Sequence, residues 1–243
     1  FENVRMIRLD PATRCSHTRQ ATFEEVAGRL SAVTGQKVSP IPAQRADLQQ
    51  ALQPNVNEIF FASKLVLVEG IEDHAYITSW MVLTQRLDEY RRHGCHLVAV
   101  NGKSNLIKPV VIAQALNIPT FVVFDADGGV NADGRRKQHE MDNKALLRLL
   151  GGDEAQFFPP ETVWGEQFVM WPHDIGSTLR SDVGDVVWNK TYAEATKGLG
   201  SPDGSYQKNP IHIGDHLELL KMAQVVPRSL ERLCDQIVRF AAS

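Results

Sequence analysis

The sequence is poor in cysteine and has no long apolar run. Its three cysteines, Cys15, Cys95 and Cys234, are widely spaced and odd in number, which suggests neither a disulfide framework nor a zinc site. Reduced cysteines fit a reducing compartment, so we expect a cytoplasmic protein. No apolar stretch approaches the roughly 20 residues that a membrane-spanning helix needs, so we expect no membrane partner.

A strong charge of one sign is also absent. The chain has 26 Lys and Arg residues against 29 Asp and Glu residues, for a net charge of -3. Domains dedicated to nucleic-acid binding are usually basic, so this balance argues mildly against DNA as a partner. The argument weakens where carboxylates hold metal ions, because the metals reverse the local sign. A local basic cluster is present at residues 135–137.

Two short apolar runs end in acidic residues. Residues 64–70 read KLVLVEG and are followed by Asp73, and residues 120–128 read TFVVFDADG. Short β-branched or aromatic runs closed by glycine are typical of buried strands in a parallel sheet. The carboxylates then lie at the carboxyl ends of two strands, where open α/β sheets build their sites. Carboxylates that converge there are natural ligands for hard divalent cations.

Strand and helix patterns alternate through the middle of the chain. This alternation predicts right-handed βαβ crossovers and a parallel sheet. The predicted strands span residues 65–69, 96–100, 120–125 and 166–171, and the predicted helices between them span residues 72–92 and 109–116.

The segments on either side of this alternating region are predicted to be mostly helical. Residues 1–60 contain a capping box that begins at Thr22, and residues 183–243 contain three helical stretches, at 185–197, 211–223 and 227–241. We therefore expect an α/β core over residues 61–182. The sequence opens on Phe1 with neither an initiator methionine nor a signal-peptide pattern, so we expect a piece of a longer protein.

Spacing suggests that the two acidic clusters act together. Glu69 and Asp73 are four residues apart across a predicted strand-to-helix turn, so both can face one point. Asp125 and Asp127 are two residues apart, so an extended backbone would put them on one side. A single carboxylate at a strand end is often only a helix cap, but chance explains the joint pattern less well.

These residues resemble the Toprim fold of topoisomerases, primases and small nucleases, which carries a glutamate after its first strand and an Asp-x-Asp after its third. Residues 57–73 are more narrowly similar to the OLD (overcoming lysogenisation defect) nucleases. The resemblance implies a metal-dependent DNA endonuclease whose parent protein has an N-terminal ABC-type ATPase domain and acts with a helicase. Residues 1–60 would then include the tail of that ATPase. The chain has no Gly-x-x-x-x-Gly-Lys-[Ser/Thr] motif, so we expect no nucleotide cofactor.

The resemblance implies that Glu69, Asp73, Asp125 and Asp127 are catalytic carboxylates that bind two divalent metals, Mg²⁺ or Mn²⁺. Phosphodiester cleavage needs an activated water and stabilisation of charge on the attacked phosphate and on the leaving oxygen. Two metals held by carboxylates supply these functions.

The later part of the chain supplies the remaining expected site residues. A lysine characteristic of the family matches Lys208, whose ammonium would neutralise charge that develops on the phosphate. Lys103 is the next candidate for that role. A further metal ligand is expected after the fourth strand, with Asp174 the best match and Ser177 an alternative.

Two other functions stay open at this point. Residues 124–129 resemble the nucleophile loop of haloacid-dehalogenase-type phosphatases, in which Asp125 would attack phosphorus. That interpretation leaves Glu69 and Asp73 unexplained. The second alternative is a non-catalytic Toprim module that only binds DNA or protein partners, although such a module does not need the full acidic set.

Overall fold

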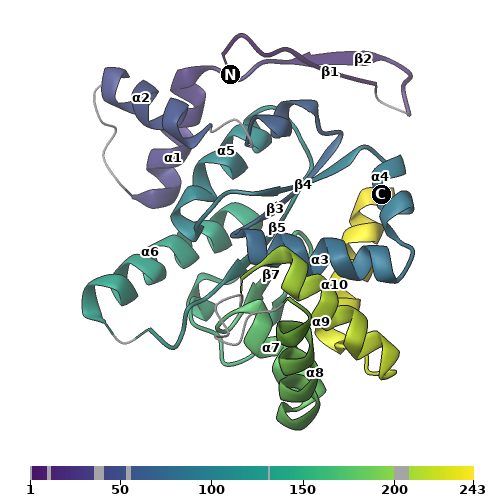
Figure 1. Cartoon of the computed structure of the whole chain (residues 1–243). Coiled ribbons are helices and arrows are strands. Elements are labelled where there is room, and N and C mark those ends of the chain that lie inside the picture. The colour runs from purple at the N-terminus through teal and green to yellow at the C-terminus, as the bar shows by residue number, and fades with distance from the viewer. Residues whose placement is uncertain (1, 10–11, 36–40, 53–55, 131, 200–207) are drawn as a thin grey trace.

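A five-stranded sheet forms the centre of the protein (Figure 1). The structure, a computed structural model, describes residues 2–9, 12–35, 41–52, 56–130, 132–199 and 208–243. The strand order is β4-β3-β5-β7-β6, with β4, β3, β5 and β7 parallel and β6 antiparallel at one edge. The predicted α/β class and parallel sheet are confirmed. The strands are β3 (Lys64–Val68), β4 (Cys95–Ala99), β5 (Thr120–Asp125), β6 (Val163–Trp164) and β7 (Phe168–Trp171).

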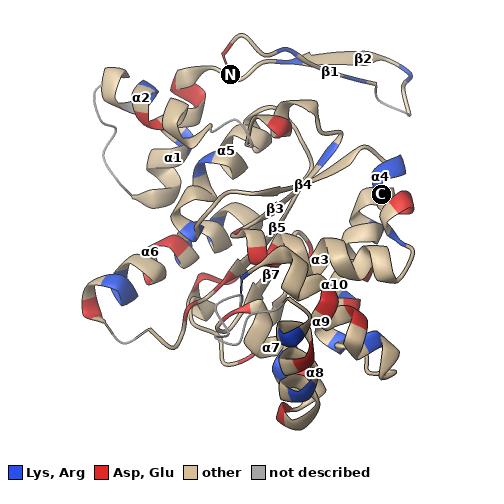
Figure 2. Cartoon of the chain, viewed as in Figure 1, with Lys and Arg blue, Asp and Glu red and all other residues tan. Residues whose placement is uncertain are grey.

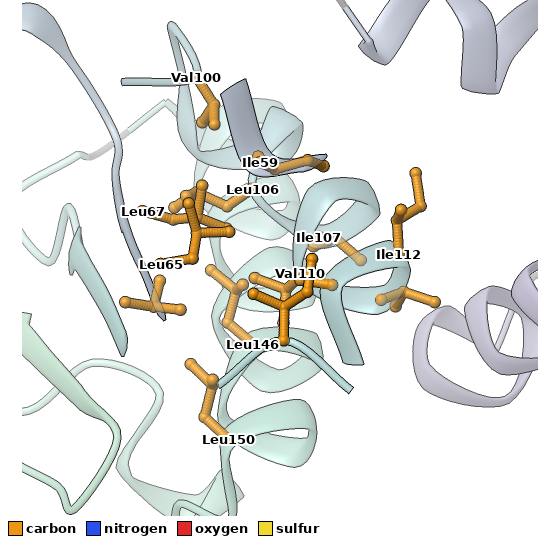
Figure 3. Packing of buried hydrophobic residues seen from close by; sticks show 14 of the residues in the cluster. Ile59, Leu65, Leu67, Val100, Leu106, Ile107, Val110, Ile112, Leu146 and Leu150 are labelled. Carbon is orange, nitrogen blue, oxygen red and sulfur yellow. The ribbon is translucent and has the colours of Figure 1, made fainter. Parts of the chain in front are cut away.

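Helices cover both faces of this sheet. Side chains alternate along β3, so Leu65 and Leu67 enter one hydrophobic layer while Val66 and Val68 enter the other. Figure 3 shows Leu65 and Leu67 close to Val110 and Leu146 in the first layer. Burial on both faces explains why these strands read as continuous apolar runs.

The two layers are built from different parts of the chain. The first layer contains α1 (Phe23–Thr34), α2 (Ile41–Ala51), α5 (Ile107–Ala115), α6 (Asp133–Leu150) and the 3-10 helix η1 (Val56–Phe61). The second contains α3 (Ile71–Leu83), α4 (Leu87–Arg92), α7 (Ile175–Val183), α8 (Asp185–Gly198), α9 (Pro210–Met222) and α10 (Arg228–Ala242). Short 3-10 turns η2 (Lys103–Asn105) and η3 (Glu154–Gln156) complete the described elements. None of the described helices has the length and apolar character needed to cross a membrane.

The N-terminal segment, predicted to be mostly helical, also contains two strands. Residues 1–60 begin with an antiparallel hairpin of β1 (Met6–Leu9) and β2 (Ser16–Arg19), drawn in purple at the top of Figure 1. Arg8 ties this hairpin to the start of β3, because its guanidinium donates to the carbonyl of Ser63 at 2.8 Å. One half of the predicted capping box is present, with the Glu25 amide donating to Thr22 Oγ1 at 3.1 Å, whereas the Glu25 carboxylate pairs with Arg19 and Arg29.

The long helix predicted over residues 72–92 is two helices, α3 and α4. The chain turns at Gln85, which adopts a left-handed backbone with a φ of 61°. The Arg86 amide then donates back to the Met81 carbonyl at 2.8 Å, which closes the end of α3. The break directs the Arg86 guanidinium to Glu231 and Asp235 of α10.

The C-terminal helices α8, α9 and α10 confirm the predicted stretches within one or two residues. The segment between α8 and α9 lies mostly outside the described residues, which begin again at Lys208. Lys64, the first residue of β3, donates its ammonium to the Phe240 carbonyl at 3.1 Å and the Ala241 carbonyl at 2.8 Å. A cation at the carboxyl end of a helix stabilises that helix, so this contact fastens α10 to the central strand. The predicted division at residues 60/61 and 182/183 stays a prediction.

Candidate functional site

An acidic cavity lies at the carboxyl ends of β3, β5 and β7. Its volume is about 450 Å³. Figure 2 shows red segments gathered beside β5 and β7, where these strands end. The lining residues are mostly charged: Glu69, Glu72, Asp125, Asp127, Gly129, Val130, His173, Asp174 and Lys208. The parallel sheet therefore brings Glu69, Asp125, Asp127 and Asp174 to one point from three strand ends.

Asp125 and Glu69 form the centre of this cavity. The Asp125 backbone amide donates to Glu69 Oε2 at 3.4 Å. Burial raises the pKa of Asp125 well above its ordinary range, and repulsion from Asp73 and Glu69 adds to the effect. Burial also raises the pKa of Glu69, although Lys103 opposes that shift. The Asp125 Oδ1 atom is buried and has no hydrogen-bond partner among the described residues.

Asp73 lies behind the cavity and does not line it. Its Oδ2 atom accepts a hydrogen bond from the Gly70 amide at 2.9 Å, which caps the start of α3. Its Oδ1 atom is buried without a hydrogen-bond partner in the described chain. Burial raises the pKa of Asp73 to about 7, and repulsion from Glu69 and Glu72 contributes. The structure thus brings Asp73 close to the acidic group, and its role as a metal ligand stays a prediction.

Asp127 reaches the cavity by a different backbone path from the one expected. It is left-handed, with a φ of 56°, rather than extended. Lys103 donates to Asp127 Oδ2 at 2.5 Å and to the Asp125 carbonyl at 2.7 Å. His139 Nδ1 lies 3.1 Å from the same Asp127 oxygen. A turn and two basic side chains, rather than strand alternation, therefore orient this carboxylate.

Lys103 is more central than the sequence indicated. Its side chain is only 3% exposed and is enclosed by the strand ends. It follows Gly102, whose φ of 120° suits glycine and whose amide donates to the Glu69 carbonyl at 2.8 Å. This turn brings the lysine beside the acidic group. The Asn-Gly-Lys sequence of the turn was therefore the feature from which the central place of Lys103 could have been predicted.

Lys208 reaches the cavity from the second helical layer. Its Nζ atom lies 3.4 Å from Glu72 Oε2, and its side chain is 79% exposed. Attraction to Glu72 raises the pKa of Lys208, with smaller contributions from Asp125 and Asp174. Glu72 was missed as a site residue, although its place in the first turn of α3 between Glu69 and Asp73 was a usable signal. Burial raises the pKa of Glu72, and Lys208 opposes that shift.

Asp174 lines the cavity, whereas Ser177 does not. Asp174 caps α7, because its Oδ1 atom accepts a hydrogen bond from the Ser177 amide at 2.7 Å. The Ser177 hydroxyl donates to the Asp174 carbonyl at 3.0 Å. Both side chains therefore have capping contacts in this structure, and their roles as metal ligands stay predictions.

The donor atoms fit hard divalent cations, but the side chains are not closed into a cage. Oxygen ligands are what Mg²⁺ and Mn²⁺ prefer, and two buried carboxylate oxygens, on Asp73 and Asp125, have no hydrogen-bond partner among the described residues. No three of the described Asp, Glu, His and Cys side chains are already arranged to hold a metal ion. A cation bound here would therefore have to draw the carboxylates together.

Sequence comparison supports the Toprim interpretation over part of the chain. Residues 60–127 match the family model described as "Overcoming lysogenization defect protein-like, TOPRIM domain". These residues run from the end of η1 to Asp127 and so include Glu69, Lys103 and Asp125. The predicted OLD-type Toprim domain is confirmed for this segment. No curated protein sequence matches the chain.

Two solved structures are similar in outline. The C-terminal region of the OLD protein of Xanthomonas campestris pv. campestris has a TM-score of 0.48 at 16% identity, covering 76% of this chain and 96% of that chain. The C-terminal region of the Burkholderia pseudomallei OLD protein has a TM-score of 0.46 at 18% identity, covering 74% of this chain and 99% of that chain.

The buried acidic group should make the protein less stable as pH rises. Asp73 binds its proton more tightly in the folded than in the unfolded chain, so stability falls as pH increases from about 4 to about 7. Asp73→Asn keeps an oxygen that can cap Gly70 but removes the charge. We expect it to raise the free energy of unfolding at pH 8 by up to about 4 kcal/mol, because the pKa of Asp73 is raised by about three units and one unit corresponds to about 1.4 kcal/mol.

Urea unfolding in EDTA at pH 5 and pH 8 measures this effect. The matched control is Asp88→Asn, which removes an exposed carboxylate from the first turn of α4. The control should not gain stability at pH 8. Equal stability changes for Asp73→Asn at the two pH values would contradict the assigned pKa.

Proposed function

We propose that this chain is the catalytic domain of a metal-dependent DNA endonuclease. Residues 60–127 match an OLD-like Toprim domain, a type of domain that generally binds divalent metals. The observation that carries the proposal is the convergence of Glu69, Asp125 and Lys208 in one acidic cavity at the sheet edge. DNA is the proposed substrate.

Each residue of the cavity has a distinct part in this proposal. Glu69 and Asp125 are the central ligands, and two Mg²⁺ or Mn²⁺ ions bound there would supply an activated water and stabilise phosphate charge. Lys103 holds Asp127 in position through its hydrogen bond to Oδ2. Lys208 is exposed at the mouth of the cavity, so its ammonium can meet a phosphate oxygen from the solvent side.

The two alternative functions fit the site less well. A phosphatase that uses Asp125 as its nucleophile gives no part to Glu69, although Glu69 Oε2 accepts a hydrogen bond from the Asp125 amide at the centre of the cavity. A module that only binds DNA has no use for buried carboxylates that repel each other and the substrate. Phosphoenzyme trapping at Asp125 would support the phosphatase, and DNA binding without cleavage would support the binding module.

Cleavage should depend on metal and not on ATP. We expect the chain to nick or cut plasmid DNA when Mg²⁺ or Mn²⁺ is added, and to be inactive in excess EDTA. Added ATP should leave the rate unchanged, because the sequence has no P-loop. Agarose-gel assays of supercoiled plasmid measure each condition. Robust cleavage in excess EDTA would eliminate the metal-dependent mechanism.

Substitution of the central carboxylates should abolish that cleavage. Glu69→Gln and Asp125→Asn each remove a charged oxygen that no neighbour replaces, so activity should fall to background while the fold is retained. The matched control is Glu166→Gln, which changes an exposed carboxylate just before β7, at the opposite end of the sheet. Near-parental cleavage by a folded Glu69→Gln or Asp125→Asn variant would exclude that residue from the site.

Lys208 should affect turnover more than metal binding. An ammonium that stabilises charge in the transition state is worth roughly 10²–10³ in rate, so Lys208→Ala should lose about that factor in single-turnover nicking. Metal affinity should change little, because a cation is not a ligand, and Lys208→Arg should restore activity only partly. The matched control is Lys190→Ala, an exposed lysine of α8. If Lys208→Ala cleaves at the parental rate, Lys103 is the next candidate.

A further inference from the structure

The first turn of α6 carries an unusual concentration of positive charge. Arg135, Arg136 and Lys137 are consecutive there and outnumber the one acid of the first turn, Asp133, and Figure 2 shows blue beside red at the outer end of α6. Cations at the amino end of a helix oppose the helix dipole, so local stability does not favour this arrangement. Within the described chain, the ion pairs of α6 involve His139, Lys144 and Arg148, but not Arg135 or Lys137.

One face of α6 is fastened to the strand ends that form the cavity. His139 contacts Asp127 at 3.1 Å, and Asn143 donates to the Ala126 carbonyl at 2.8 Å. Asp142 accepts a hydrogen bond from the Ser104 hydroxyl at 2.6 Å. These three contacts fix which side of the helix faces the site.

Arg135 lies on the same face of α6, in the part of the helix that extends beyond the sheet. It precedes His139 by four residues, so it lies on the same side of the helix, about 6 Å further along the axis. Arg135 is nevertheless exposed, because the helix has passed the strand ends at this point. Lys137 lies about 200° around the helix from Arg135 and points away from the site.

Arg136 keeps the basic turn in place. Its guanidinium donates to the Gly128 carbonyl at 3.1 Å and the Val130 carbonyl at 3.3 Å, and it lies 4.4 Å from the centre of the Phe158 ring. Val130 lines the cavity. The start of α6 is therefore tied directly to the cavity wall, so Arg135 is held next to the opening.

Arg135 and Lys208 are exposed cations that lie on opposite sides of the sheet. Arg135 belongs to α6 in the first helical layer, whereas Lys208 directly precedes α9 in the second layer. Glu69 and Asp125 lie at the strand ends between them.

We propose that the sugar-phosphate backbone of DNA crosses the carboxyl edge of the sheet from Lys208 to Arg135. The phosphate to be cleaved then lies in the cavity, and Arg135 binds a flanking phosphate. This path rests on the proposed nuclease function. The path also explains how DNA can approach an acidic cavity. Such a cavity repels DNA unless cations beside it bind the backbone. Arginine suits this task because its planar guanidinium matches phosphate geometry.

Salt-dependent binding tests the path. The affinity of a short fluorescein-labelled duplex is measured by anisotropy between about 50 and 200 mM NaCl, a range in which phosphate contacts weaken strongly. Ca²⁺ replaces Mg²⁺, and gels confirm that the DNA stays intact. Arg135→Ala should bind several-fold more weakly at low salt, and its slope of log K against log[salt] should be shallower by about 0.9.

The matched control is Lys137→Ala, which removes the same charge from the opposite side of the same turn. It should keep the parental slope, and thermal melts should show both variants folded, because both positions are exposed. Equal slope changes in the two variants would assign the effect to overall charge and overturn the path. A parental slope for Arg135→Ala would overturn it as well.

Cleavage assays separate this inference from the nuclease proposal. If the unsubstituted chain cuts DNA with Mg²⁺ while Arg135→Ala retains parental affinity and slope, only the path is wrong. If Arg135→Ala shows the expected loss of affinity but the unsubstituted chain cuts nothing, DNA binds along this path without being cleaved, and the nuclease proposal falls. In an active enzyme Arg135→Ala should raise KM and leave kcat near parental, as expected of a contact away from the reacting phosphate.

Discussion

Mutual repulsion among buried carboxylates is the constraint on which the rest of this structure depends. Burial disfavours the charge on Asp125 and Asp73, and their proximity adds to the cost, as their raised pKa values show. Two hydrophobic layers offset this cost by fixing the strands that carry the acids. Lys103 and Lys208 relieve part of the charge, one from inside the sheet edge and one from solvent. The protein thus keeps an acidic pocket at the ends of strands that are buried on both faces.

Much of the central sheet could be predicted because its strands have a simple signature. β3 and β5 are buried on both faces, so each reads as an apolar run, and the acids that follow them fall at the same sheet edge. Local sequence patterns did not predict the elements that are very short or that depend on contacts between residues far apart in the sequence. β6 has only two residues, and the N-terminal hairpin has four-residue strands, too few to display a period. The split between α3 and α4 occurs at Gln85, a residue type that gives no breaker signal.

The candidate site was predictable to a similar degree, and for similar reasons. Acids directly after apolar runs were visible, and the structure brings Glu69, Asp125 and Asp127 together. The placement of Lys208 beside Glu72 depends on how the second helical layer packs, which no local pattern encodes. Lys103 was only the second candidate after Lys208, because its burial arises when distant strand ends come together in the fold. The sequence did not point to His139, because this residue comes into contact with Asp127 only in the folded chain.

The contact between Lys64 and α10 has a consequence for how this chain folds. It joins residues separated by 176 and 177 positions, and the Phe121 and Phe240 rings lie 5.7 Å apart in the same region. Closing so long a loop carries a large entropic cost, and architectures rich in distant contacts assemble slowly. The first hydrophobic layer can form from residues up to Met170, whereas the second stays open until α10 docks. The second face of the sheet is therefore fully covered only when α10 docks, so apolar surface stays exposed on that face until this long loop closes.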